Sequence, residues 1–570
     1  MAPLDFRGGS AGTPVFTRSA WLVWLIAGGL AFVPASSQAA GTVTNCSQAN
    51  LIAAMAGGGT VTLACNGTIT LTSPLTNATD TLIDGTGHQV ILSGSNQVQV
   101  ISVRGSTRLA LVHLTIADGA AAIGAGLLNC NGSVYATNCV FVNNSAWSEG
   151  GGIFNQGTMV LELCLVTNNQ AVGGSGFGAG MDAAGGAIYN AGTLGVQRTT
   201  LASNRAAGGM GGWTGYVGTN GGNGYGGAIY NQGNLWLEAC TLAGNSTLGG
   251  NGGPGAPGIP MGRGAADGVA GGNGGQGFGC LDNVGTATII NSTFVANAVG
   301  GGGGGSGGAG GTGELAGGNG GNGGNGNSGY GVIAGGGPVF LTNCTLASNI
   351  GINGAAGTAG GAGGHLQPGG TSGSPGSAGA PGFGSIGGIY ASCCYLVNTL
   401  LGGSSGNCGG RVIDGGYNLS SDGSCGFTAP GSRNEIDPML ASPADNGGPT
   451  ATMAFSPNSP ALNAGSAVGA PGTDQRGVHR PQGPGVDIGA FEFQYPRFDA
   501  AVVAAGTNCW LQMTGLELGQ AFLIQASSNL LNWSTITNFA VPTNGCFEYD
   551  DPRPMTAGPR FYRLQLLLGN

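Results

Sequence analysis

The central part of the sequence holds few side chains that could perform acid–base chemistry. Hydrolysis of a glycosidic bond needs two convergent carboxyl groups, whereas a lyase needs a base, often beside a cation held by several acids. Several of the available acids stand in glycine-rich stretches. The acids between residues 119 and 406 are Glu149, Glu162, Asp182, Glu238, Asp267, Asp282 and Glu314.

Glu162 and Glu238 occupy equivalent positions of a repeat, with Gln197 at the intervening position and Arg198 next to it. We expect these side chains to stack on an outward corner instead of facing each other across a cleft. An exposed Glu–Arg corner is usually a solvated surface feature. The sequence therefore predicts no catalytic residue, no metal site and no cofactor.

Aromatic residues could bind sugars by stacking on them. Phe154, Tyr189 and Tyr230 each precede an asparagine of the repeat, and we expect them to form an exposed strip. Such a strip either stacks on polysaccharide or stabilises the fold, since aromatic pairs contribute beyond their buried area.

A repeat positions all of these residues. Counting from Asn155 as zero, apolar or small residues recur at +4, +6, +9 and +11, and asparagine recurs at +14. Steps of two place side chains on one face of a strand, and the step of three between +6 and +9 requires a corner. The predicted ladder at +14 consists of Asn144, Asn169, Asn204, Asn245, Asn297 and Asn349.

A single such coil cannot bury its apolar face, but stacked coils can. The sequence thus predicts an all-β fold: a right-handed parallel β-helix solenoid with glycine-rich loop insertions, followed by a small C-terminal β-sandwich. The +9 position also aligns four cysteines, which we interpret as buried thiols. Equivalent positions of stacked coils lie in a straight row, and such a row cannot surround a metal ion tetrahedrally. The four cysteines are Cys139, Cys164, Cys240 and Cys344.

The glycine-rich inserts leave each coil at the same corner, so they must project from one side of the solenoid. Glycine recurs with period three in several of them, as in residues 317–325. That period fits extended helices of three residues per turn lying side by side, but it also fits a flexible loop. Both interpretations stay open from the sequence.

The N-terminal segment indicates export. Residues 1–39 contain an apolar run after Arg18 and a small-residue cleavage pattern, which predicts a signal peptide and a mature chain without a transmembrane domain. The net charge is −9 and lysine is absent, so a nucleic-acid partner is not expected.

The sequence contains 14 cysteines, which in an exported protein suggests disulfides. The predicted pairs are Cys46–Cys65 around a capping helix, Cys408–Cys425, and Cys509–Cys546. In the capping helix, Ser47 is the expected N-cap, and Leu51, Ile52 and Met55 are expected on one face.

Two sets of motifs resemble a known family. The GG-A-I-Y-N turns ending at Asn190 and Asn231 are similar to repeats of polymorphic outer-membrane proteins and pectin-lyase-like β-helix proteins. Segments such as GGYNL (415–419), DNGGPT (445–450), TDQRG (473–477) and DIGAFE (487–492) resemble the choice-of-anchor Q type of exported bacterial protein. This resemblance covers about residues 41–495 and implies a β-helix displayed outside the cell, with no established chemistry.

The C-terminal strip of that resemblance carries charges that we expect to form ion pairs. These side chains are Asp474, Arg476, Arg480 and Asp487, and the intervening His479 gives a weaker catalytic alternative. After residue 495 the composition changes to strand-like alternation. Trp533 could contact carbohydrate there, although a core position is the commoner role.

The predicted organisation has five parts. They are a signal peptide (1–39), a cap helix with the first coils (40–118), β-helix repeats with glycine-rich inserts (119–406), a C-terminal β-helix cap (407–495) and a β-sandwich module (496–570). We expect a secreted or cell-surface protein with a non-catalytic adhesion or structural role, and extracellular polysaccharide as the partner class. The alternatives are a polysaccharide lyase or glycoside hydrolase, and a polysaccharide-binding scaffold.

Overall fold

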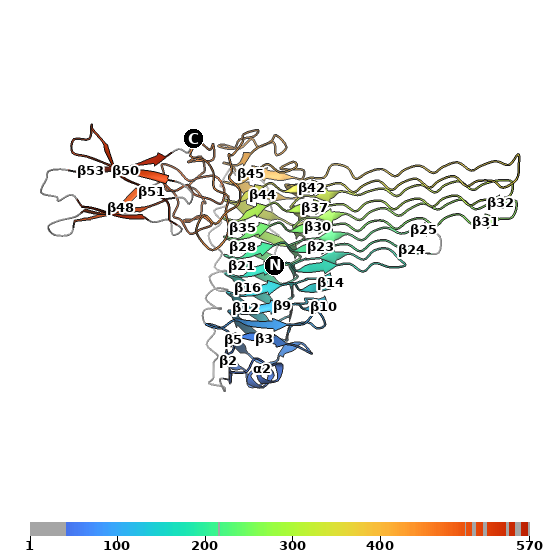
Figure 1. Ribbon diagram of the computed structural model, residues 1–570, viewed down its shortest axis with the longest axis horizontal. Coiled ribbons are helices and arrows are strands. Elements are labelled where there is room, and N and C mark those ends of the chain that lie inside the picture. Colours follow the sequence, from blue (N-terminus) through green and yellow to red (C-terminus); the bar gives the residue numbers. More distant parts are fainter. Residues whose placement is uncertain are drawn as a thin grey trace, which may run out of the picture.

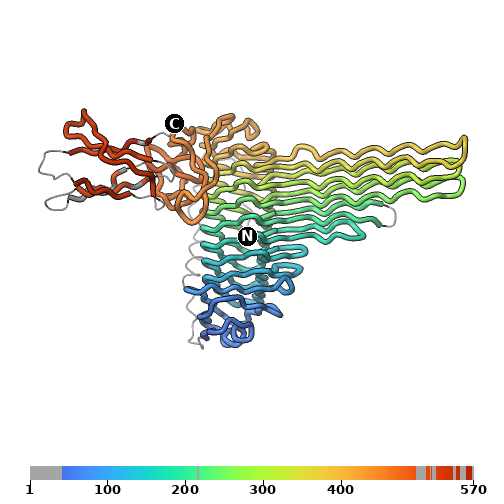
Figure 2. Tube along the Cα trace, in the orientation of Figure 1, coloured from blue at the N-terminus to red at the C-terminus, as the bar shows by residue number. Residues whose placement is uncertain are grey.

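The computed structural model describes residues 41–567 apart from residues 215–216, 496, 504–508, 517–520, 543–546 and 553–559. The predicted signal peptide therefore lies outside the described residues. The described chain forms a column of stacked coils, a thin blade that projects sideways from the column, and a C-terminal sandwich (Figure 1; Figure 2). The predicted parallel β-helix followed by a β-sandwich is confirmed.

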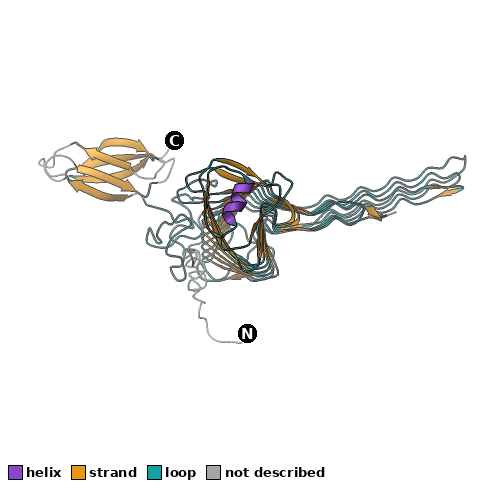
Figure 3. Cartoon of the chain, turned by 90° about the horizontal axis from the view of Figure 1, so that it is seen from below, coloured by secondary structure: helices purple, strands orange, loops and turns teal. Residues whose placement is uncertain are grey.

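A short helix closes the first coil. The helix α2 (Gln48–Met55) begins at Ser47, whose hydroxyl accepts a hydrogen bond from the Asn50 backbone N–H. Leu51 and Met55 are buried, and the Cys46–Cys65 disulfide ties the segment to the coil, as predicted. Ile52 was expected on the same face, but 47% of it is exposed, because the helix turns this position towards solvent. Figure 3 shows α2 lying across the end of the coils.

Three parallel sheets run along the column. The first, which we name sheet A, is 12-stranded. Its strands are β1 (Gly41–Val43), β2 (Gly59–Leu63), β5 (Thr81–Asp84), β8 (Arg108–Val112), β12 (Ser133–Thr137), β16 (Thr158–Glu162), β21 (Thr193–Gln197), β28 (Asn234–Glu238), β35 (Thr286–Ile290), β40 (Val339–Thr342), β44 (Cys394–Val397) and β46 (Val412–Asp414).

Sheet B follows sheet A within each coil and is 11-stranded. Its strands are β3 (Gly67–Thr70), β6 (Val90–Ser93), β9 (Thr115–Ala117), β13 (Val140–Val142), β17 (Leu165–Thr167), β22 (Thr200–Ala202), β29 (Thr241–Ala243), β36 (Thr293–Val295), β41 (Thr345–Ala347), β45 (Leu400–Gly402) and β47 (Leu419–Ser420).

Sheet C closes the coil and is 9-stranded. Its strands are β4 (Leu75–Asn77), β7 (Ile101–Arg104), β11 (Leu127–Cys130), β15 (Ile153–Asn155), β20 (Ile188–Asn190), β27 (Ile229–Asn231), β34 (Leu281–Asn283), β39 (Ile333–Gly335) and β43 (Ile389–Ala391).

Left-handed residues make the predicted corner between sheets A and B. The +8 position has a positive φ in every repeat, although L side chains rarely adopt that conformation. The angles are 51° at Asn138, 53° at Leu163, 47° at Arg198, 55° at Ala239, 46° at Asn291 and 50° at Asn343. The bend lets the residues at +6 and +9 both point inward, which was the reason for predicting it.

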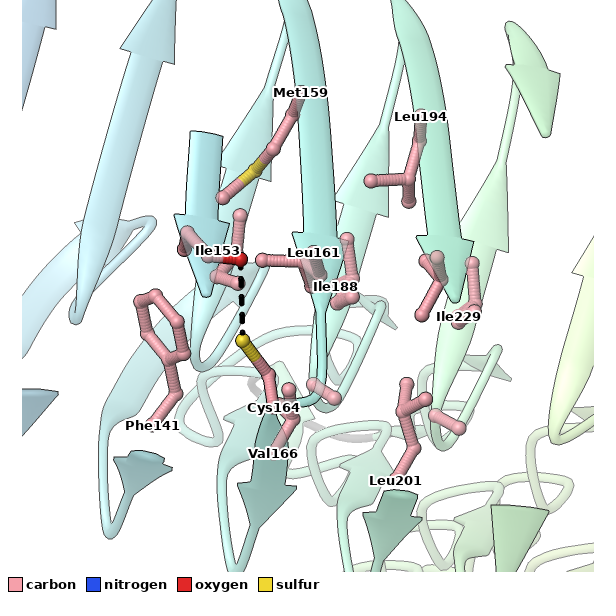
Figure 4. Packing of buried hydrophobic residues seen from close by; sticks show 14 of the residues in the cluster. Phe141, Ile153, Met159, Leu161, Cys164, Val166, Ile188, Leu194, Leu201 and Ile229 are labelled. Carbon is pink, nitrogen blue, oxygen red and sulfur yellow. Dashed lines mark hydrogen bonds between the residues drawn. The ribbon is translucent and has the colours of Figure 1, made fainter. Parts of the chain in front are cut away.

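Buried apolar side chains and cysteines fill the interior of the coils, and equivalent residues stack from one coil to the next (Figure 4). Leu161, Cys164 and Val166 lie on sheets A and B beside Ile188 of sheet C, and all four are buried. The Cys164 thiol donates to the carbonyl of Ala136 in the preceding coil at 3.4 Å. The cysteine column is therefore buried and hydrogen-bonded to backbone, and burial raises the pKa of Cys139, Cys240 and Cys344 to about 12.

The predicted asparagine ladder at +14 is fully buried, with every member 0% exposed. The Nδ2 group of each of the first five members donates to the Oδ1 atom of the next coil at 2.9–3.0 Å, and each Oδ1 also accepts a backbone N–H. A second ladder joins Asn129, Asn155, Asn190, Asn231 and Asn283 at 2.6–2.7 Å. Both ladders satisfy backbone groups that the corners leave unpaired.

The glycine-rich inserts form the blade. Five hairpin-like fingers extend from the coils and stack in order, and the later ones reach furthest (Figure 1). We number them fingers 1 to 5: residues 170–185, 205–226, 246–279, 298–331 and 350–387. The strands at the finger roots belong to a fourth, 11-stranded sheet, sheet D.

The strands of sheet D include outgoing and returning segments. The outgoing set is β14 (Ser145–Glu149), which pairs with β10 (Ala120–Ile123), then β18 (Gln170–Val172), β23 (Arg205–Ala207), β30 (Ser246–Leu248), β37 (Ala298–Gly300) and β42 (Ile350–Ile352). The returning set is β19 (Ala183–Ala184), β26 (Gly224–Tyr225), β33 (Gly277–Phe278) and β38 (Gly329–Tyr330). Two finger tips form small hairpins, β24 (Trp213–Thr214) with β25 (Val217–Gly218) and β31 (Pro260–Met261) with β32 (Gly264–Ala265).

Beyond their roots the fingers form two layers, one of outgoing and one of returning chains. Hydrogen bonding follows a three-residue cycle: Gly304 donates to Ala355 of the next finger, Gly305 donates to Gly272 of the other layer, and Ser306 points to solvent. A Cβ on Gly305 would lie 2.0 Å from the Gly253 carbonyl oxygen. The inserts are thus extended three-residue-per-turn helices lying side by side, and the flexible-loop alternative is wrong.

Residues 407–495 were expected to cap the end of the solenoid, and only their first part does so. The Cys408–Cys425 disulfide is present, as predicted, and the buried Phe427 closes the core near it. The remainder folds back along the flank of sheet B. There the Gln475 side chain bonds Thr241 at 2.8 Å and Thr293 at 2.6 Å, in coils far below the end.

The C-terminal module consists of two three-stranded antiparallel sheets. One comprises β48 (Arg497–Val503), β49 (Cys509–Thr514) and β52 (Phe547–Asp551), and the other comprises β51 (Ser534–Ala540), β50 (Ala521–Ser527) and β53 (Phe561–Leu567). Leu511, Met513, Phe522 and Ile524 lie in its core. Cys546 lies outside the described residues, so its pairing with Cys509 stays a prediction.

Candidate functional site

A groove of about 450 Å³ runs between the corner of the coils and the C-terminal strip. Glu162, Arg198 and Glu238 line its coil side, and residues 473–477 line the other. These side chains were expected to stack on an outward corner and not to face each other across a cleft, and both carboxylates do lie on the coil side. The groove itself was not predicted from the sequence. The missing information was the path of the strip, which returns along this flank.

The acids of the groove are already engaged. Glu162 forms an ion pair with Arg198 and accepts a hydrogen bond from the Tyr135 hydroxyl, while Glu238 accepts one from the Trp236 indole at 3.3 Å. The two carboxylates lie two coils apart, or about 10 Å at the usual spacing of strands. Paired acids of inverting glycosidases lie about 6.5–9.5 Å apart, so the groove has room for such chemistry but holds its acids in other contacts.

The charged residues of the strip form a buried network. Arg476 pairs with Asp474 at 2.8 Å and lies over the Phe491 ring at 3.7 Å. Arg480 was expected to form an ion pair within this set of four, but its partner is Glu492 at 2.7 Å, and it bonds only the backbone carbonyl of Asp487. The Asp487 carboxylate accepts the N–H groups of Asn463 and Phe493 instead.

Burial and the neighbouring Glu492 raise the pKa of Asp487 to about 7. Burial also lowers the pKa of Arg480, although its acidic neighbours oppose that effect. His479, the basis of the catalytic alternative, is exposed on the strip. The arrangement therefore holds the strip in place, because every charge except that of His479 faces a partner inside the protein.

The predicted aromatic strip is present but not exposed. Phe154 and Tyr189 are only 4% and 7% exposed, and Tyr230 is half-buried, so the prediction of an exposed strip was wrong. The returning finger strands cover it with Tyr225, Phe278 and Tyr330. Ring centroids along the whole stack, from Phe154 to Tyr390, lie 4.8–5.8 Å apart.

One carboxyl group lies inside this aromatic column. Asp282 pairs in register with Tyr230, is 4% exposed, and has no hydrogen-bond partner for its carboxyl group among the described residues. Burial raises the pKa of Asp282 to about 7. The sequence contains this acid among the few in the repeats, but nothing in its spacing indicates that the blade root covers it.

A second set of aromatic side chains was missed. Tyr135 and Trp236 lie on the outer face of sheet A in the same row as Gly195, and both are partly exposed beside the groove. Strand alternation could have identified them, because they stand between the inward positions +4 and +6. Trp533 of the sandwich is half-buried at its surface under Arg563, at 4.4 Å, and is not a core residue.

The blade presents two broad faces, which we name by their layer. The outgoing face carries small and apolar residues and has a shallow hollow of about 540 Å³ around Met210, Asn251 and Ala355. The return face carries mainly asparagine and serine. In the sequence, these faces are indicated by every third residue of the glycine-rich stretches, because that residue points to solvent.

Comparison of the chain with family models, with curated proteins and with solved structures gives no match. In the described part of the chain, no cluster of three or more His, Cys, Asp or Glu side chains is arranged to hold a metal ion. None of the described helices has the length and apolar character needed to cross a membrane. The two disulfides fit an oxidising compartment.

Proposed function

We propose that this protein is exported and displayed outside the cell, where it acts as a non-catalytic adhesive surface protein. The column of coils serves as a rigid support, and the blade is the contact surface. One observation carries this proposal: the fingers are ordered by backbone hydrogen bonds into a thin plate with two wide solvent-facing sides. A plate of this kind offers many weak contacts at once.

Export and display rest on further support. The predicted signal peptide, the disulfides and the resemblance of the C-terminal strip to choice-of-anchor Q proteins point the same way. The acids of the flank groove are held by Arg198, Tyr135 and Trp236, which favours a binding role over a hydrolytic one.

Adhesion of coated beads tests the proposal. Beads carrying the mature chain should adhere to some members of a panel of cells and polysaccharide films. The double variant Gly305→Ala, Gly308→Ala should disorder the blade and abolish adhesion, while circular dichroism shows that the coils remain folded. Gly361→Ala is the matched control, since a Cβ there meets no atom within 4 Å. Undiminished adhesion by the double variant would contradict the role of the blade.

A carbohydrate-active enzyme is the second candidate, favoured by the groove that contains Glu162 and Glu238. A depolymerisation screen on the mature chain, with and without calcium, tests it. Activity lost in Glu238→Gln, with its fold intact, would establish the enzyme and overturn the non-catalytic proposal.

A further inference from the structure

The return face of the blade carries a two-dimensional array of mainly polar side chains. Each returning segment places one residue in three outward, and the segments of neighbouring fingers lie side by side. The members of the array are Asn220, Asn223, Asp267, Ala270, Asn273, Asn319, Asn322, Asn325, Ser374, Ser377 and Ala380.

Hydrogen bonds between fingers fix the orientation of the amide groups. The Oδ1 atom of Asn273 accepts the backbone N–H of Asn325 at 2.8 Å, and Oδ1 of Asn325 accepts that of Ala380 at 2.8 Å. Asn319 and Asn322 accept the N–H groups of the next finger in the same way, both at 2.8 Å. Only an oxygen can accept from an N–H, so the identity of each amide atom is determined.

The amide nitrogens are therefore left facing solvent. Within the described chain, the Nδ2 groups of Asn273, Asn319, Asn322 and Asn325 have no protein hydrogen-bond partner, and all four residues are exposed. Each Nδ2 carries two donor hydrogens. The face consequently presents fixed donors in rows, while the amide oxygens accept backbone N–H groups of the next finger.

The spacing of these donors is regular. Three residues of an extended three-per-turn helix advance about 9.3 Å, which separates Asn319, Asn322 and Asn325. Hydrogen-bonded fingers lie about 5 Å apart, which separates Asn273 from Asn325. A periodic, flat set of donors matches a ligand that itself repeats and offers acceptors on a flat side.

Charge and shape narrow the class of ligand. The chain has a net charge of −9, Asp267 belongs to the array, and none of the array members is basic, so a polyanion is disfavoured. The array also lacks aromatic residues, so single sugars cannot be held there by stacking. Hydroxyl-rich neutral glycans supply uncharged acceptors, and extended β-linked chains packed side by side are flat and periodic.

We infer that the return face binds the surface of an extended, neutral polysaccharide through its rows of asparagine amide donors. This inference rests on the proposed adhesive function and names its binding face and ligand class. The many separate donors act together, since each amide contributes little by itself in water.

The triple variant Asn319→Asp, Asn322→Asp, Asn325→Asp removes the donors while keeping the oxygen that each neighbouring finger needs. The chain already uses this substitution, because the Asp267 carboxylate accepts the Asn319 N–H at 2.6 Å. The matched control is Ser306→Asp, Ala309→Asp, Thr312→Asp, which adds the same charge to exposed positions of the outgoing face.

Depletion isotherms on insoluble cellulose and chitin give the measurement. We expect the wild-type chain to bind at least one of them, the return-face variant to bind at least tenfold more weakly, and the outgoing-face control to stay within twofold of wild type. Equal binding by all three proteins, or equal weakening of both variants, would overturn the inference. Wild-type binding to alginate or heparin alone would overturn it as well.

Failure of this inference can be told apart from failure of the proposed function. A wild-type chain that mediates bead adhesion through the blade but binds neither neutral polymer contradicts the inference and leaves the adhesive function standing. Adhesion that persists when the blade is disordered contradicts the proposed function, whichever polymer is bound.

Discussion

Asparagine ladders occur in two regions of this protein and perform different tasks. In the coils, Asn245 is buried and uses both its amide nitrogen and its oxygen inside the protein. On the blade, Asn322 uses only its oxygen and turns its amide nitrogen to water. The same residue type is structural in the first place and available for binding in the second.

The two regions also differ in what fills their interior. Between the sheets of a coil lie leucine, isoleucine, valine and cysteine side chains, so hydrophobic burial stabilises the stack. Between the layers of the blade lie glycine backbones, with an N–H···O=C bond at most residues that do not face solvent. The coils therefore tolerate exchange of similar apolar side chains, whereas most glycines between the layers of the blade leave no room for a Cβ atom.

The largest effect should come from adding one methyl group to the blade interior. Gly305→Ala places a Cβ 2.0 Å from the Gly253 carbonyl oxygen, and both chains are fixed by hydrogen bonds on either side. Overpacking typically costs about 1–3 kcal/mol and more where the backbone cannot move. Hydrogen–deuterium exchange should show loss of protection in fingers 3 to 5 and unchanged protection in the coils. Gly361→Ala should leave both regions unchanged; equal effects of the two substitutions would refute the comparison.

Removal of a buried ladder residue should disturb a smaller part of the molecule, although its cost in free energy is comparable. Asn245→Ala leaves the Asn204 N–H and Nδ2 groups without their acceptor and the Leu201 carbonyl without its donor. At about 1–3 kcal/mol for each unsatisfied buried group, we expect a loss of roughly 3–5 kcal/mol in urea denaturation. Asn322→Ala should cost less than about 0.5 kcal/mol, because water replaces its single exposed contact. A similar cost at both sites would show that the ladders do not differ.

The seam between coil and blade should show a pH dependence through Asp282. Its pKa is about 7 in the fold because of burial and near 3.9 in an unfolded chain, so the folded state binds the extra proton. Stability should fall as the pH rises from about 4 to 7, and stay low above 7. Each tenfold change in an ionisation constant corresponds to about 1.4 kcal/mol, so the change amounts to a few kcal/mol.

Asp282→Asn should remove this part of the pH dependence and stabilise the protein at pH 8, measured by thermal melts across the pH range. Asp267→Asn removes one carboxylate from the exposed return face and provides the control for the change in net charge. A pH profile of Asp282→Asn that matches wild type would show that the Asp282 carboxyl group does not hold an extra proton in the folded state.

The smallest effect is expected at the outer edge of the blade. In finger 4, Gly320 and Gly323 donate to finger 5, but the corresponding residues of finger 5 include Pro375, which has no N–H. Proline at an edge prevents pairing with a further strand. Pro375→Ala should change stability by less than about 0.5 kcal/mol. Analytical ultracentrifugation should show increased self-association of the variant, and an unchanged sedimentation profile would indicate that Pro375 does not protect this edge.

Much of the architecture could be predicted because it is local and repeated. The offsets from Asn155 fix which side chains face inward, and each copy of the repeat confirms the others. The disulfides Cys46–Cys65 and Cys408–Cys425 were also predictable, since each joins residues fewer than 20 positions apart. The candidate site was less predictable, because the groove depends on residues 473–477 meeting coils more than 200 positions earlier, as Gln475 meets Cys240.

The sequence by itself determined the coil, because a periodic pattern can bury its apolar residues in only one stacked arrangement. Tertiary structure alone decided where the inserts and the C-terminal strip lie. A glycine triplet has no side chain to favour one partner over another. Its order therefore comes from the neighbouring fingers, which the stacked coils hold at the right spacing. The same packing buried Phe154, Tyr189 and Asp282 and exposed the amides of the return face, which no spacing along the chain could specify.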